Sequence, residues 1–122
     1  MRLVVIEVLL QLLFRRLGFG ISNRGISFGL ASEIPMVFLI LGLILFLLVG
    51  WERRSELWWK MMFSGAFANL VTRAIFDGQV WDYLRLYPLS LWFNGADLMI
   101  FAGTIVVVWQ WRLKYFGRTR TF

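Results

Sequence analysis

Four apolar runs divide this chain of 122 residues. The run from Ile34 to Trp51 contains 18 residues without a charge. A bilayer core of about 30 Å needs about 20 apolar residues in a helix, so this run and its flanks are long enough to cross a membrane. Two further runs, residues 57–76 and 89–111, are of similar length but carry polar side chains. All three are predicted to be membrane-spanning helices.

The first run, residues 3–17, is shorter and can be interpreted in more than one way. Its apolar part, Leu3–Phe14, is interrupted by Glu7 and Gln11 and is followed by two arginines. Twelve helical residues extend about 18 Å, which is less than a full crossing. A secretory signal peptide is disfavoured because of Glu7 and because no A-x-A cleavage site follows. We interpret the run as a short first span, with a helix lying in the membrane interface as the alternative.

Composition agrees with one integral membrane domain over residues 1–122. Apolar residues make up 60% of the chain and its mean hydropathy is +0.72, well above the values of ordinary soluble domains. Because Cys and His are absent, disulfides, thiol chemistry and histidine-based catalysis are excluded. No metal or organic cofactor is predicted. The net charge of +6 is spread between the apolar runs, which favours membrane lipids over nucleic acid as partners.

The charge distribution also predicts an orientation. With four spans, both termini lie on one side of the membrane, together with eight basic residues, against five on the other side. The basic tail, residues 112–122, directly follows the last span. Cytoplasmic segments carry an excess of Lys and Arg, so we expect both termini to be cytoplasmic.

Polar residues within the apolar runs form two groups. Asn69, Thr72 and Arg73 are spaced i, i+3 and i+4, which places them on one face of a helix. Asn94 and Asp97 share a face in the same way. Polar groups at membrane depth usually face the bundle interior and mark a functional site, although hydrogen bonding between helices is an alternative role.

In order along the chain, these groups and the loops beside them form four short motifs. The first is NRGISFG at 23–29, in a glycine-rich loop whose alternating pattern favours a short strand or hairpin. The others are GAFANLVTR at 65–73, VWDY at 80–83 and FNGAD at 93–97. The set resembles the bacterial lipoprotein signal peptidases (signal peptidase II), whose elements are N-x-G-x-x-F-[GS], G-A-x-x-N-x-x-D-R, V-x-D-[FY] and F-N-x-A-D.

The resemblance implies an all-α membrane protein with four transmembrane helices and a small extracytoplasmic β-like cradle. It implies an aspartic endopeptidase of the bacterial inner membrane, with its site near the outer face. Its partners would be membrane lipids and the signal peptides of lipid-modified prolipoproteins. The resemblance makes Asp97 one of two catalytic aspartates and places Thr72 where the family has the other. Supporting or substrate-binding roles fall to Asn23, Asn69, Arg73 and Asn94.

A threonine cannot replace a carboxyl that shares a proton, so the pair is incomplete at Thr72. The nearest candidate substitutes are Asp77 and Asp82. Asp82 fills the V-x-D-[FY] position, to which the resemblance assigns no catalytic role. Asp77 falls where the chain has one extra residue between the arginine and the glycine. Glu7 and Gln11 match what remains of a D-Q-x-x-K-like element in the first span.

Three functions therefore remain open. The first is a working lipoprotein signal peptidase with an altered catalytic pair. The second is an inactive relative that binds lipidated or signal-peptide-like helices without cleaving them. The third is a small structural membrane protein whose motifs serve packing alone. Cleavage gained by Thr72→Asp would indicate the second.

Overall fold

The computed structural model describes residues 1–25 and 35–117, and most of these residues are helical. The elements follow in the order α1 (Arg2–Arg16), β1 (Ile21–Asn23), α2 (Met36–Gly50), η2 (Trp51–Arg53), α3 (Leu57–Ile75), β2 (Val80–Asp82), β3 (Leu84–Leu86), β4 (Leu91–Phe93) and α4 (Gly95–Phe116). The predicted helical class is thereby confirmed. Ser27, Phe28 and Gly29 of the first motif lie outside the described residues.

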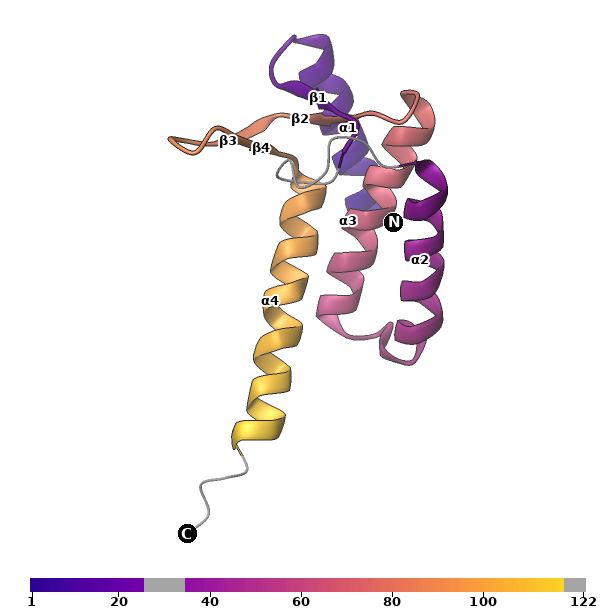
Figure 1. The fold of residues 1–122 in the computed structure, drawn as a ribbon, viewed down its shortest axis with the longest axis vertical. Helices are drawn as coiled ribbons and strands as arrows, with labels where there is room; N and C mark the ends of the chain where they lie inside the picture. Colours follow the sequence, from indigo (N-terminus) through magenta and orange to yellow (C-terminus); the bar gives the residue numbers. More distant parts are fainter. Residues whose placement is uncertain (26–34, 118–122) are drawn as a thin grey trace.

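Helix α3 is the centre of the arrangement. It packs against α4, α1 and α2, while the strands gather at one end of the helices and the C-terminal end of α4 extends away from them (Figure 1). Small residues allow the closest of these contacts, because a side chain on Gly65 would meet the backbone of Ala96 and one on Gly103 would meet the backbone of Trp58. Close helix contacts of this kind are typical of membrane bundles.

The interior of the bundle is polar near the strands. Fully or nearly fully buried polar residues are Glu7, Gln11, Ser64, Thr72, Arg73, Asp82, Asn94 and Asp97. Large apolar side chains instead remain exposed along the outer faces of the helices; those of α2 include Val37, Phe38 and Leu48. Apolar outside and polar inside is the pattern expected where lipid rather than water surrounds the helices.

The strands form two small antiparallel ribbons, β1 with β2 and β3 with β4. Strand β1 confirms the strand expected after the first span. The last span, however, begins later than predicted, since Leu91–Phe93 pairs with β3 and α4 starts only at Gly95. The reason is local, because Asn94 and Asp97 form a capping box that fixes the start of the helix.

Among the described residues, two helical segments are long and apolar enough to cross a membrane: Met36–Arg53 and Gly95–Phe116. Helix α1, at 15 residues, extends only about 22 Å. Helix α3 has 19 residues but carries Lys60 and Arg73 among its apolar positions. The crossing of all four helices therefore stays a prediction, as do the orientation of the termini and the role of the strands as a cradle.

Candidate functional site

Asp97 lies in the first turn of α4, where the helix end holds its carboxylate. The Asn94 side-chain oxygen accepts a hydrogen bond from the Asp97 backbone N–H at 3.0 Å. In return, Asp97 Oδ2 accepts from the Asn94 backbone N–H at 3.2 Å. Both side chains are buried. Unpaired N–H groups and the helix dipole make such an end suited to a carboxylate.

A second carboxyl, that of Asp82, meets the same asparagine. Asp82 is 1% exposed, and its Oδ1 accepts from the Asn94 side-chain amide at 2.9 Å. Its Oδ2 accepts from the Asn23 side-chain amide, also at 2.9 Å. Because Ile21 pairs with Asp82 in the ribbon of β1 and β2, Asn23 lies diagonally across from Asp82 on the same face. Asn94 therefore connects the carboxyls of Asp82 and Asp97.

Burial raises the pKa of Asp82 from 3.8 to about 6. Loss of solvent around the charged form is the largest cause, and the negative charge of Asp97 adds to it. Hydrogen bonds from Asn23 and Asn94 and the charge of Arg73 act in the opposite direction. Asp82 can therefore keep a proton at a pH where most carboxyls are ionised.

Asn69 reaches this cluster from α3. Its amide nitrogen donates to Asp97 Oδ1 at 3.1 Å, and its oxygen accepts from Gln11 at 3.3 Å. Gln11 also donates to Glu7 at 3.2 Å, and the Tyr83 hydroxyl donates to Glu7 at 2.8 Å. Glu7 and Gln11 of α1 thus belong to the same buried network as Asn69 and Asp97.

Thr72 is fully buried on α3, one turn beyond Asn69. Its hydroxyl donates to the carbonyl of Ala68 in its own helix at 3.0 Å, a common arrangement for threonine in helices. A hydroxyl has a single hydrogen, so Thr72 has none left to offer to a bound carbonyl in this conformation.

Asp77 lies on the surface, with a fully exposed side chain that is 4.0 Å from the Arg24 guanidinium. A solvated carboxylate of this kind is not placed to share a proton with buried Asp97. Asn94, which caps α4 and bonds to Asp97, is therefore in contact with Asp82. The hydroxyl of Thr72 instead bonds to Ala68, and Asp77 lies on the surface. This differs from the sequence-based interpretation of Asp82 as a motif residue without a part in the pair.

Arg73 supports the site through the backbone. Its guanidinium donates to the carbonyls of Arg24 at 3.0 Å and Gly78 at 2.9 Å, and also to that of Gly25. One buried side chain thus ties the segment after β1 to the turn before β2. Asn23 and Asp82 lie on these two strands, so Arg73 ties together the two segments that carry them.

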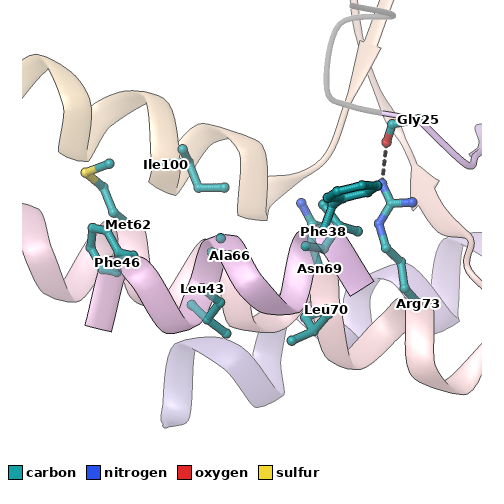
Figure 2. Close-up of a pocket in the computed structure, with 12 residues that line it drawn as sticks. Gly25, Phe38, Leu43, Phe46, Met62, Ala66, Asn69, Leu70, Arg73 and Ile100 are labelled. Atoms are coloured by element: carbon teal, nitrogen blue, oxygen red, sulfur yellow. Dashed lines mark hydrogen bonds between the residues drawn. The ribbon is translucent and has the colours of Figure 1, made fainter. Parts of the chain in front are cut away.

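A cavity of about 320 Å³ lies between α2, α3 and α4 beside this cluster. Phe38, Leu43 and Phe46 line it from α2, and Asn69 and Arg73 are at its polar end (Figure 2). Most of the other lining residues are apolar. Because Asn69 both lines the cavity and donates to Asp97, the cavity is separated from the Asp97 carboxyl by one side chain.

Three residues of the network were missed or undervalued by sequence reasoning. Asp82 gave no periodic signal, because a three-residue strand is too short to show one. Gln11 and Tyr83 lie in the sequence far from the residues they contact. The sequence did contain one indication, namely that Glu7 and Gln11 interrupt an apolar run at a spacing of one helical turn.

This arrangement is suited to acid–base chemistry. Two carboxyls connected by one asparagine differ in environment, since one lies at a helix N-terminus and the other has a raised pKa. Carboxyls whose environments separate their protonation states can act as a base and an acid in the same reaction. Asp82 and Asp97 lie in two such different environments.

Comparison with known proteins agrees with the motifs. The sequence model of the family described as Signal peptidase (SPase) II matches residues 7–113. Relatives described as lipoprotein signal peptidases from Bartonella henselae, Moorella thermoacetica and Fusobacterium nucleatum are 28%, 31% and 32% identical to this chain. These alignments cover 85%, 74% and 72% of this chain, and 71%, 64% and 59% of the relatives. The resemblance inferred from the sequence is confirmed.

A solved structure described as a bacterial membrane enzyme, determined by the in meso method, has the same fold. It matches with a TM-score of 0.69 at 16% identity, over 98% of this chain and 92% of that chain.

Proposed function

This chain belongs to the signal peptidase II family, and we propose that it is a membrane aspartic endopeptidase with Asp82 and Asp97 as its catalytic carboxyls. Its reaction would remove the signal peptide from lipid-modified prolipoproteins. The observation that carries the proposal is the pair of hydrogen bonds that Asn94 donates to the two carboxyls, from its side-chain amide to Asp82 and from its backbone N–H to Asp97. With Asp82 in this role the pair is complete, and Thr72 does not have to supply an acid.

In the proposed reaction a water molecule lies between the two carboxyls. The water oxygen attacks the scissile carbonyl carbon while ionised Asp97 takes a proton from the water. At the same time protonated Asp82 gives its proton to the carbonyl oxygen. The tetrahedral intermediate then returns that proton to Asp82. The leaving nitrogen takes the proton held by Asp97 as the C–N bond breaks. Both carboxyls finish as they began, and one water has been consumed.

The apolar cavity beside the pair supports a substrate with an apolar segment. It is lined by α2, α3 and α4 and leads to Asn69, whose amide contacts Asp97. A substrate held in the membrane by its signal peptide and lipid would place apolar groups there and its scissile bond at the polar end. Four crossings, cytoplasmic termini and a site near the outer face of the bacterial inner membrane are part of this proposal.

The test is cleavage by the purified protein in detergent. A diacylglyceryl-modified prolipoprotein is added, and the released signal peptide is measured by mass spectrometry. We expect wild-type cleavage to be abolished by Asp82→Asn and by Asp97→Asn. Cleavage that persists in Asp82→Asn would refute the pair. If the wild-type chain binds the substrate but does not cleave it, the chain is an inactive relative. If it neither binds nor cleaves, a structural role remains.

A further inference from the structure

Gln11 is a fully buried amide on α1. With Val4 and Glu7 it forms the buried stripe of this helix. A buried amide must find partners for its polar atoms, because leaving one unpaired destabilises the fold. The partners of Gln11 come from different elements of the fold, which makes its position informative.

The orientation of the Gln11 amide is fixed by a backbone group. The Trp81 backbone N–H, which can only donate, points to Gln11 Oε1 at 3.1 Å. The amide nitrogen of Gln11 is therefore on the other side, where it donates to Glu7 at 3.2 Å and to Asn69 Oδ1 at 3.3 Å. Exchange of the oxygen and nitrogen would place donor against donor at Trp81.

The orientation of the Gln11 amide also fixes which atom of Asn69 faces Asp97. Since Asn69 Oδ1 accepts from Gln11, the Asn69 amide nitrogen faces Asp97 Oδ1, to which it donates at 3.1 Å. At the other end of Gln11, Trp81 directly precedes Asp82 in β2. One side chain therefore contacts both the strand that carries Asp82 and the asparagine that contacts Asp97.

Glu7 holds Gln11 in place from the same helix. Its carboxyl accepts from the Tyr83 hydroxyl at 2.8 Å, and that hydroxyl in turn accepts from the Gly95 backbone N–H at 3.1 Å. Gly95 is the first residue of α4. Helix α1 is thus attached to the start of α4 through Glu7 and Tyr83, and to β2 through Gln11.

We propose that Gln11 is a positioning residue that sets the orientation of Asp82 and Asp97 relative to each other. The proposal rests on the proposed function, in which these carboxyls act as a pair. The hydrogen bonds of Gln11 go to Glu7, Asn69 and Trp81. It acts through the backbone of Trp81 on one side and through the Asn69 amide on the other.

Two substitutions test the contacts that the Gln11 amide makes through its oxygen to Trp81 and through its nitrogen to Glu7 and Asn69. Gln11→Met keeps the length of the side chain but removes the contacts of both amide atoms. Gln11→Lys keeps a donor toward Asn69 and Glu7 but cannot accept from Trp81. A matched control is Gln110→Met, because Gln110 is an exposed amide toward the far end of α4. Circular dichroism and thermal unfolding in detergent verify that each variant is folded.

In the cleavage assay, misplacement of catalytic groups lowers kcat rather than substrate binding. We expect Gln11→Met to lower kcat by about 10²-fold while KM changes by less than about twofold. Gln11→Lys should fall between Gln11→Met and wild type, and Gln110→Met should equal wild type. Wild-type kcat in a folded Gln11→Met, with Asp82→Asn inactive, would overturn the positioning role and leave the proposed function standing.

A second readout does not need turnover. Hydrogen–deuterium exchange of the Trp81 backbone amide reports its bond to Gln11 Oε1. We expect exchange to accelerate at least about tenfold in both Gln11 variants and not in Gln110→Met. If the wild-type chain does not cleave, the proposed function fails, and this measurement decides the anchoring by Gln11 alone. Unchanged Trp81 exchange in Gln11→Met would overturn it.

Discussion

The side-chain amide of Asn94 donates to Asp82 at 2.9 Å, although the two residues belong to different elements. The oxygen of the same side chain caps α4 by accepting from the Asp97 backbone N–H. The Asn94 side-chain oxygen therefore stabilises the start of α4, while its side-chain nitrogen contacts a carboxyl of the proposed catalytic pair. Substitutions at Asn94 can remove one contact without the other.

Asn94→Ser should keep the helix cap and lose the contact with Asp82. Serine is a good N-cap residue, but its short hydroxyl cannot replace the amide donor. We expect a melting temperature near that of wild type and a lowered cleavage rate. Asn94→Ala should lose both functions and cost about 1 kcal/mol of stability in addition. Thermal unfolding and initial rates, measured on the same samples, check this; equal rates for Asn94→Ser and wild type would contradict it.

Thr72→Asp should not increase cleavage. The hydroxyl of Thr72 is buried and bonded within its own helix to Ala68, so a carboxylate there would have to be buried in place of a paired hydroxyl. Burying a further charge without a partner is costly, and we expect a melting temperature several degrees lower. Asp77→Asn is the matched surface variant and should behave as wild type, because Asp77 is fully exposed. A gain of activity in Thr72→Asp would instead indicate that Asp82 and Asp97 do not form a complete catalytic pair and that an acid is needed at position 72.

The raised pKa of Asp82 predicts how stability depends on pH. In the folded protein this group keeps its proton up to a pH of about 6, whereas its ordinary pKa is 3.8. Between these values the folded state binds more protons than the unfolded state, so stability falls as the pH rises through this window, by up to about 3 kcal/mol. Melting temperatures of wild type and Asp82→Asn from pH 4 to pH 7 test this, since the variant should lack this component.

Activity should follow the same group. Because protonated Asp82 is the proposed acid, we expect kcat to decline as the pH rises above about 6. The Asn23 amide stabilises the ionised form of Asp82, so Asn23→Ala should raise the pKa of Asp82 and move this decline to higher pH. A pH profile that is the same in Asn23→Ala and wild type would contradict the assignment of Asp82 as the acid.

Gly65→Ala should separate α3 from α4. The added carbon would collide with the backbone oxygen of Ala96 and would lie 2.9 Å from Ile100 Cγ1. Overpacking of this kind costs about 1–3 kcal/mol. Gly42→Ala is the control, because nothing lies within 4 Å of a carbon added there. Thermal unfolding of the two variants should differ clearly, and a Gly65→Ala protein as stable as Gly42→Ala would refute the close packing of α3 and α4.

The sequence predicted those features that depend on local pattern. An uninterrupted apolar run gives α2, and helical spacing correctly placed Asn69, Thr72 and Arg73 together on α3. The start of α4 was predicted too early, because Leu91–Phe93 is as apolar as a helix but pairs as a strand. Local composition alone does not distinguish the two.

The place of Asp82 in the site could not be predicted from local sequence pattern. Asn23 and Asp82 are 59 positions apart and meet only because β1 and β2 pair. Likewise, Gln11 and Trp81 are 70 positions apart. Motif position directed attention to Thr72, whereas strand pairing brings Asp82 to Asn23. Short strands between helices carry too little sequence signal to predict such pairing.

The length of α4 is comparable to the thickness of a membrane. Its 22 residues extend about 33 Å, close to the thickness of a bilayer core. Asp97 is near the beginning of this rod, and the aromatic residues Trp111, Tyr115 and Phe116 are near its end. In the proposed function, a substrate helix aligned with α4 would meet Asp97 at one membrane boundary only if its apolar segment had a matching length. Shortening or lengthening its apolar segment by a single turn would displace the scissile bond by about 5 Å from the carboxyls.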